Sequence, residues 1–341
     1  MFVNTFMKIT PVLLAGGNGT RLAPLSQTKL PKQFLQFFSN KKSSFQLTAI
    51  RIRNTFRNET LLIAANNIHT NIIKQQLSEI NEVNYTIIVE QKAKNTFPII
   101  ASIAKICEQD DVLFLTPTDL IIEDIDKLAR QIQISSMYCY LNKKHILFGI
   151  KPTSPESNFG YIKTKTSSTL SNKHNNNDAV YDDMFNTSLF HEVDCFIEKP
   201  PIETAEIFYR SNKYYWNSGM FIFNRELLFQ NITNYNQFVL NGVNIIQKQK
   251  EDENLARSQQ DYLSTYLKTK KPHQTIENIQ QIDVNYDDNM PSISIDNAII
   301  HNITQDIKCV IADFQWLDFG NWKNFISILF QNKITLQQDT I

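Results

Sequence analysis

The feature that most constrains the fold is the alternation of short apolar runs with helix-like stretches over residues 10–119. Runs typical of buried strands cover residues 10–16, 61–65, 85–90 and 111–119, and stretches with helical periodicity lie between them at 44–56, 68–80 and 98–108. This alternation indicates βαβ units, in which helices cover both faces of the sheet. We therefore predict an α/β fold with a Rossmann-like, mixed and mainly parallel sheet and helices on both faces.

The pattern becomes less regular after residue 145. We expect strands at 145–152 and 192–200 and a strand that leads into a helix at 216–227. A polar, mainly helical stretch is expected at 234–280. The Asn-rich segment 166–188 is expected to be a solvated insertion loop. We predict one α/β domain over residues 1–285 and a small C-terminal segment, residues 286–341, that completes its site.

The composition restricts the partners of the chain. Its 341 residues carry 34 Lys plus Arg and 34 Asp plus Glu, so no net charge draws it to nucleic acid or to an anionic membrane. No apolar run approaches the roughly 18 residues of a membrane helix. The four cysteines are scattered without metal-ligand spacing, as in a protein with reduced thiols. We expect a cytoplasmic protein with neither a nucleic-acid nor a membrane partner.

A glycine-rich loop follows the first expected strand. Gly16, Gly17 and Gly19 can adopt positive φ and let a ligand approach the backbone, whose amides then form an anion-binding nest. Arg21 and Lys32 add cations suited to phosphate oxygens. The pattern predicts a phosphate-binding loop. The alternative is a tight turn followed by two surface cations.

The loop matches neither of two common phosphate-binding motifs. A Walker loop, G-x-x-x-x-G-K-[ST], is absent, and the third glycine of the dinucleotide motif is missing. Pro24 and Pro31 favour an extended segment over a helix after the turn. We therefore expect the loop to fold over a triphosphate.

The motifs together resemble those of sugar-nucleotidyltransferases, and most closely those of mannose-1-phosphate guanylyltransferases. The resemblance covers about residues 8–325 and includes, in family order, LLAGGNGTRLAPLS, PKQF, KNTFPIIAS, LTPTD, FGIKPTSPESNFGYI, FIEKP, WNSGMFIF, PSISIDNAI and WLDFGNW. It implies the transfer of a guanylyl group from GTP to mannose 1-phosphate, with GDP-mannose and pyrophosphate as products.

Such a transfer is an in-line displacement at the α-phosphorus, and its nucleophile is already an anion. The chemistry needs charge neutralisation rather than a strong base, and Mg²⁺ held by one or two carboxylates suits it. Asp119 follows an apolar strand, where it could instead cap the next helix, and Asp318 lies between two tryptophans. The resemblance implies that Asp119 and Asp318 bind the metal.

The resemblance also implies roles for the other site residues. The catalytic residues would be Arg21, Lys32, Asp119 and Asp318. The nucleotide would lie near Leu14, Ala15, Gly16, Gly17, Gly19, Thr20, Asn95 and Thr96, and the sugar phosphate near Gly149, Gly160, Glu198, Lys199, Asn217 and Asp296. In a regular strand, the neighbours Glu198 and Lys199 would point to opposite faces.

Two departures from the family pattern leave the choice of base open. Lys94 stands where the family has Arg, and the bulky Phe97, where it has Ala, would crowd a base pocket. The alternatives are the same chemistry with another NTP and hexose 1-phosphate, or a non-catalytic sugar-nucleotide-binding subunit. We expect a single activity without the cupin-type isomerase domain of longer relatives, and a homodimer is left open.

Overall fold

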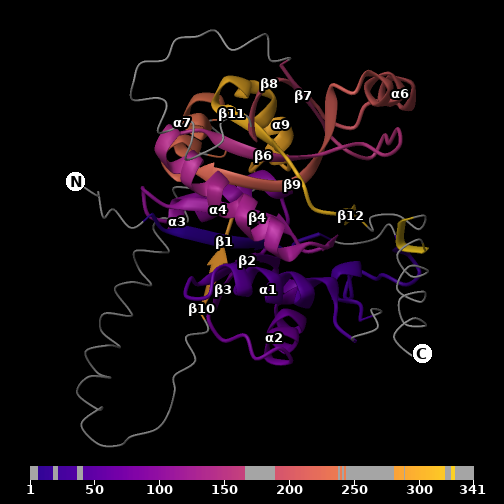
Figure 1. The fold of residues 1–341 in the computed structure, drawn as a ribbon. Coiled ribbons are helices and arrows are strands. Elements are labelled where there is room, and N and C mark those ends of the chain that lie inside the picture. The colour runs from indigo at the N-terminus through magenta and orange to yellow at the C-terminus, as the bar shows by residue number, and fades with distance from the viewer. Residues whose placement is uncertain are drawn as a thin grey trace, which may run out of the picture.

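The structure is a computed structural model that describes residues 7–17, 22–36, 41–165, 189–236, 239, 242, 280–287, 289–318 and 324–326. A ten-stranded sheet with strand order β10-β3-β2-β1-β4-β9-β6-β11-β8-β7 forms its centre (Figure 1). These strands are β1 (Ile9–Leu14), β2 (Leu61–Asn66), β3 (Tyr85–Glu90), β4 (Val112–Pro117), β6 (His145–Ile150), β7 (Tyr161–Thr164), β8 (Phe190–Ile197), β9 (Tyr214–Asn224), β10 (Gln280–Val284) and β11 (Ile307–Ile311). A separate two-stranded sheet pairs β5 (Leu120–Ile122) with β12 (Trp316–Asp318).

Parallel and antiparallel pairing divide the main sheet. The five strands from β10 to β4 are parallel to one another, whereas β9 runs antiparallel to both β4 and β6. In the parallel part, β3 is buried along its whole length, as expected of a strand covered on both faces. The predicted mixed α/β sheet is confirmed.

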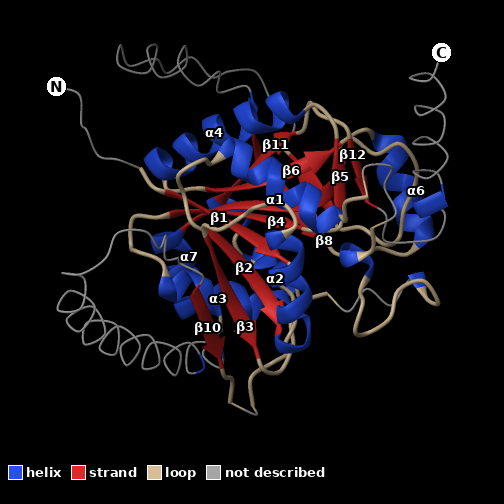
Figure 2. Ribbon diagram, turned by 90° about the horizontal axis from the view of Figure 1, so that it is seen from below, coloured by secondary structure: helices blue, strands red, loops and turns tan. Residues whose placement is uncertain are grey.

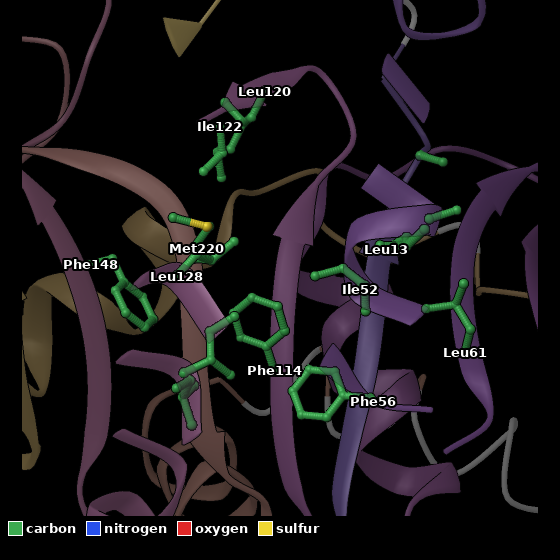
Figure 3. Close-up of a cluster of buried hydrophobic side chains, with 14 of the residues drawn as sticks. Leu13, Ile52, Phe56, Leu61, Phe114, Leu120, Ile122, Leu128, Phe148 and Met220 are labelled. Carbon is green, nitrogen blue, oxygen red and sulfur yellow. The ribbon is translucent and has the colours of Figure 1, made fainter. Parts of the chain in front are cut away.

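Helices lie on both faces of this sheet, as Figures 1 and 2 show. The helices are α1 (Ser44–Thr55), α2 (Thr70–Ser78), α3 (Thr96–Ile106), α4 (Ile125–Asn142), α6 (Ile202–Ser211), α7 (Arg225–Tyr235) and the short α9 (Ile295–Ala298). One apolar cluster joins the sheet to α1, α2 and α4, and includes Ile52, Phe114 and Leu128 (Figure 3). A second cluster joins the opposite face to α3, α7 and α9.

The predicted elements of the first 119 residues are confirmed to within a few residues at each end. By contrast, α4 was not expected, because half of its buried positions are polar and leave little apolar periodicity; they are Leu128, Gln131, Ile132, Ser135, Ser136 and Cys139. The chain beyond residue 285 contributes β11 to the interior of the main sheet. Two expected segments lie outside the described residues: the insertion loop at 166–188 and nearly all of the helical stretch after residue 236. Strand β10 begins at residue 280, where that helical stretch was expected to end.

Candidate active site

The carboxyl ends of β1 and β4 bring two predicted parts of the site together. These strands pair in parallel with Leu14 opposite Pro117, so Gly16 and Gly17 leave the sheet at the same edge as Asp119. The hydroxyl of Thr118 donates a hydrogen bond to the Leu14 carbonyl at 3.2 Å. A ligand held by the glycine loop would therefore lie beside Asp119, in the crevice where open α/β sheets bind ligands.

Gln33 anchors the described start of the glycine loop. Its amide Nε2 donates to the carbonyls of Gly17 at 2.9 Å and Ala15 at 3.3 Å, and the side chain is buried. The hydroxyl of Ser44 in turn reaches the carbonyls of Gln33 at 3.3 Å and Thr118 at 2.7 Å. Sequence reasoning missed Gln33, although it lies within the PKQF motif.

The two described glycines of the loop, Gly16 and Gly17, do not adopt the positive φ that the sequence allowed. Among the glycines that the structure describes, only Gly219 has a positive φ, at 75°. A Cβ on Gly16 would lie 3.6 Å from Oε2 of the Glu90 carboxylate, which is an ordinary van der Waals contact. The predicted site residues Gly19, Thr20 and Arg21 lie outside the described part of the chain.

A cavity of about 430 Å³ opens next to the glycines. Its lining includes most of the predicted nucleotide site and, among the residues that were not predicted, one carboxylate, Glu90; the residues are Leu14, Gly16, Gly17, Ala64, Glu90, Ala93, Asn95, Thr96, Ile99, Pro117 and Ser292. Ala15 is fully buried behind this lining. Phe97 does not crowd the cavity, because it is fully buried in the apolar cluster beneath α3.

Asn95 and Thr96 fix the entrance to α3 beside the cavity. Asn95 has a φ of 68°, and its side-chain oxygen accepts a hydrogen bond from the Thr96 amide at 2.8 Å. The Thr96 hydroxyl accepts from the amide of Ile295 at 3.0 Å, which connects this wall to α9. A left-handed residue other than glycine at a cavity rim is typical of a functional site.

Lys32 and Asp119 form an ion pair of 2.7 Å between Nζ and Oδ2. The Lys32 side chain is 9% exposed and that of Asp119 is 29% exposed, so the pair is largely removed from water. The sequence motifs predicted both residues but not their contact, which joins the PKQF segment to the end of β4. The pair places one positive and one negative charge near the glycine loop.

Asp318 lies on the strand next to Asp119. In the small sheet Asp318 pairs with Leu120, the residue that follows Asp119. Asp318 also lines a second cavity of about 280 Å³, together with Phe159, Trp216 and Trp316. The backbone pairing thus brings the two predicted metal ligands to neighbouring positions.

The donor set fits a metal that takes most of its ligands from the substrate. Within the described residues, no group of three or more His, Cys, Asp and Glu side chains has a metal-binding arrangement. Mg²⁺ is commonly held by only one or two carboxylates, with phosphate oxygens and waters as its other ligands. Asp119 and Asp318 meet that requirement in number and in chemistry.

The predicted sugar-phosphate residues gather in a second group. A Cβ on Gly160 would lie 2.7 Å from Glu198 Oε2, 2.8 Å from Cζ of the buried Phe196 and 3.4 Å from Asn217 Cβ, so close packing favours glycine there. The amide of Asn217 donates to Asp296 at 3.0 Å, and its backbone N–H donates to the Gly160 carbonyl at 2.8 Å. Gly160, Glu198, Asn217 and Asp296 are therefore close neighbours.

The expectation that Glu198 and Lys199 point to opposite faces is wrong. Strand β8 ends at Ile197, and Lys199 has a φ of 46°, so the alternation of a strand no longer applies. The two side chains form an ion pair instead. Lys199 remains exposed, which leaves its ammonium accessible to an anion.

Gly149 joins this group through strand pairing. It pairs with Asn217 in the sheet, but a Cβ there would lie 2.8 Å from Cys309 Sγ and 2.9 Å from Tyr215 Cβ. Close packing of the sheet therefore accounts for a glycine at this position.

Asp296 has a strongly perturbed acidity. Burial, and next the negative charge of Glu198, raise its pKa to about 7, although Lys199 and the Asn217 amide act in the opposite direction. A carboxylate whose pKa is raised in this way at a cluster of polar groups is typical of a binding or catalytic site.

We expect Asp296→Asn to stabilise the ligand-free protein at pH 8 more than at pH 5. The folded-state pKa lies above the value of about 3.9 in an unfolded chain, so the native state loses stability as the pH rises through 7. Asn carries no charge at either pH and avoids this loss. Thermal unfolding should show a gain in Tm larger by at least about 2 °C at pH 8. Asp313→Asn, at an exposed position, is the control, and an equal gain at both pH values would contradict the assignment.

A comparison with known protein families identifies the family of this chain. The family described as nucleotidyl transferase matches residues 10–333, nearly the whole length. The chain belongs to the nucleotidyl transferase family. Both groups of site residues described above lie within the matched range of this nucleotidyl transferase.

Several relatives of this nucleotidyl transferase carry the same name. It is 38% identical over 216 residues to a mannose-1-phosphate guanylyltransferase of Salmonella montevideo, and the match covers 63% of this chain and 43% of that protein. It is 30% identical over 321 residues to an Escherichia coli protein of that name, and the match covers 93% of this chain and 60% of that protein. The chain thus spans about half the length of these relatives.

A solved structure supports the fold of this nucleotidyl transferase. A crystal structure described as mannose-1-phosphate geranyltransferase from Thermus thermophilus superposes with a TM-score of 0.68 at 19% identity, and the match covers 95% of this chain and 79% of that one. None of the described helices combines the length and the apolar character that crossing a membrane requires.

Proposed function

We propose that the protein transfers the guanylyl group of GTP to mannose 1-phosphate and releases pyrophosphate. One observation carries this proposal: the Lys32–Asp119 ion pair lies at the same sheet edge as the glycine loop and the 430 Å³ cavity. Relatives named mannose-1-phosphate guanylyltransferase point to the same substrates.

Different residues of the chain would bind the two anionic substrates, the triphosphate and the sugar phosphate. The amides of the glycine loop, with Arg21, would hold the triphosphate, while Lys199 would hold the phosphate of the incoming sugar. Glu198, Asn217 and Asp296 would accept or donate hydrogen bonds to sugar hydroxyls. Positioning of the two anions, and neutralisation of the charge that develops on pyrophosphate, would then supply most of the rate enhancement.

A divalent metal, Mg²⁺ in our proposal, would be held by Asp119 and Asp318 together with phosphate oxygens. When bound, it would neutralise charge at the reacting phosphates. Lys32 would remain near Asp119 as a further cation and would orient that carboxylate. We also propose the cytoplasm as the site of this activity.

A pyrophosphate-release screen of the four NTPs against several hexose 1-phosphates tests the proposed substrates. We expect GTP with mannose 1-phosphate to give the highest kcat/KM, and omission of divalent metal to abolish the release. A preference for another NTP and hexose 1-phosphate would support the proposed type of reaction but contradict the proposed substrates. Binding of sugar nucleotide without any release would instead favour a non-catalytic regulatory subunit.

Gln33→Ala should weaken the use of GTP. It removes the two hydrogen bonds that hold Ala15 and Gly17, and each is expected to be worth about 1 kcal/mol. Steady-state kinetics should show a KM for GTP raised by about thirtyfold, with a smaller change in the KM for mannose 1-phosphate. Gln75→Ala, at an exposed position on α2, is the control. Equal KM values for GTP in the two variants would show that Gln33 does not position the loop.

Lys199→Ala should impair the use of the sugar phosphate. The variant loses a charge-assisted hydrogen bond, so the KM for mannose 1-phosphate should rise by about tenfold or more. The KM for GTP should stay nearly constant, because Lys199 belongs to the second group of residues. Lys213→Ala, at an exposed position just before β9, is the control. A similar loss of affinity for both substrates would contradict the assignment.

A further inference from the structure

Ser44 carries a buried hydroxyl to which the proposed chemistry gives no role. It is the first residue of α1, and the structure leaves it fully buried. Helix α1 does not need this hydroxyl as a cap, because the side chain of Ser43 already accepts a hydrogen bond from the Gln46 N–H at 3.1 Å. Ser44 instead makes its hydrogen bonds outside its own helix.

These hydrogen bonds reach two segments that are distant from each other in the sequence. The Ser44 hydroxyl lies 2.7 Å from the Thr118 carbonyl, just after β4, and 3.3 Å from the Gln33 carbonyl in the short turn η2 (Lys32–Phe34). A hydroxyl carries one proton, so the shorter contact is the main hydrogen bond and the longer one shares the same proton. Both acceptor residues are buried, so bulk water would not replace a lost donor there.

Each acceptor is the direct chain neighbour of one member of the ion pair. Gln33 follows Lys32 in the sequence. Thr118 precedes Asp119, and its own hydroxyl donates to the end of β1 at 3.2 Å. One serine hydroxyl at the start of α1 therefore joins the two backbone segments from which the positive and the negative side chain extend.

We propose that Ser44 is a positioning residue that sets the separation of Lys32 and Asp119. This inference deepens the proposed function and rests on it, because that function assigns those two charges to the metal and the phosphates. The ion pair alone would be a poor spacer, because the charge of a bound cation competes with the lysine for the carboxylate. The Ser44 hydrogen bonds involve only backbone carbonyls, so they do not depend on the partner of that carboxylate.

A crystal structure of ligand-free Ser44→Ala tests this geometry without catalysis. The distance from Lys32 Nζ to Asp119 Oδ2 is 2.7 Å in the unaltered protein. We expect it to lengthen by about 1 Å, a displacement large enough to impair an active site. The matched control is Ser43→Ala, which loses a buried hydroxyl and the cap of the same helix but should keep the distance. An unchanged distance in Ser44→Ala would overturn the inference, whatever reaction the protein catalyses.

Steady-state kinetics measures the consequence for the reaction. In Ser44→Ala, kcat should fall by about tenfold, and the Mg²⁺ concentration that gives half the maximal rate should rise by about tenfold. The KM for mannose 1-phosphate should stay nearly constant, because the hydrogen bonds of Ser44 go to the other group of site residues. Ser43→Ala should keep all three values. Equal losses in the two variants would refute the positioning role, because a weakened helix start would then explain both.

A double variant shows whether Ser44 acts through the ion pair. In the Lys32→Met background, adding Ser44→Ala should lower kcat by less than about twofold, because residues that act as one unit are not additive. A further tenfold loss there would contradict the inference. Ser44→Cys keeps a weak donor of similar size and should show the same changes to a smaller extent, which preserves the test if Ser44→Ala does not fold.

The two readouts separate this inference from the proposed reaction. If the ion pair lengthens in Ser44→Ala but the unaltered protein releases no pyrophosphate from GTP and mannose 1-phosphate, the proposed reaction fails while the positioning role stands. If the unaltered protein catalyses the reaction and a folded Ser44→Ala variant retains its kcat, its Mg²⁺ dependence and the ion-pair distance, the positioning role fails while the proposed reaction stands.

Discussion

Asp119→Asn is expected to lower kcat by at least about a hundredfold, the scale observed when a main electrostatic stabiliser is lost. The amide keeps the shape of the carboxylate but removes the charge that faces Lys32 at 2.7 Å and that would hold the metal. The dependence on Mg²⁺ should shift to higher concentration in the same variant. Steady-state kinetics over a Mg²⁺ titration measures both effects.

The matched control for this variant is Asp126→Asn, an exposed change in the first turn of α4. It should leave kcat and the Mg²⁺ dependence unchanged. If Asp119→Asn keeps near-normal turnover at the same Mg²⁺ concentration, then Asp119 is not a metal ligand and its ion pair with Lys32 is structural.

Lys32→Met is the second variant with a large expected effect. Methionine retains much of the aliphatic length of this buried side chain but removes the positive charge beside Asp119. We expect kcat to fall by about a hundredfold, with a smaller rise in the KM for GTP, because the positive charge acts mainly in the transition state. Circular dichroism and thermal unfolding should confirm that the variant folds.

Two comparisons make the Lys32 prediction specific. Lys29→Met removes an exposed cation three residues earlier and should leave kcat unchanged. The double variant Lys32→Met with Asp119→Asn should lose little more activity than either single variant, because residues that act as one unit are not additive. Fully additive losses would show that the two residues act independently despite their contact.

Much of the fold followed from the sequence, because it depends on local patterns. The strand at 85–90 is rich in aromatic and β-branched residues, and β3 has those same limits. The helix α4 escaped prediction because polar side chains occupy half of its buried face. The place of β11 inside the sheet also escaped prediction, because strand order depends on pairing between distant segments.

The site was predictable only where motifs mark it. Lys32 and Asp119 were both expected, but their wide separation along the chain hid their ion pair, which depends on the sheet topology. Glu90 was missed because a single glutamate at the end of an apolar run forms no motif. The burial of Phe97 was within reach of sequence reasoning, since Phe97, Ile100, Ala101 and Ala104 have the spacing of one helical face.

Isotope tracing in GTP tests the central claim most directly. The unaltered protein is incubated with mannose 1-phosphate, Mg²⁺ and GTP that carries radioactive phosphorus at either the α- or the γ-phosphate. Our account predicts that the α-label enters a guanosine diphosphate sugar and that the γ-label leaves in pyrophosphate, in equal molar amounts. Appearance of the γ-label as inorganic phosphate with the α-label in GDP, or retention of both labels in GTP, would contradict it.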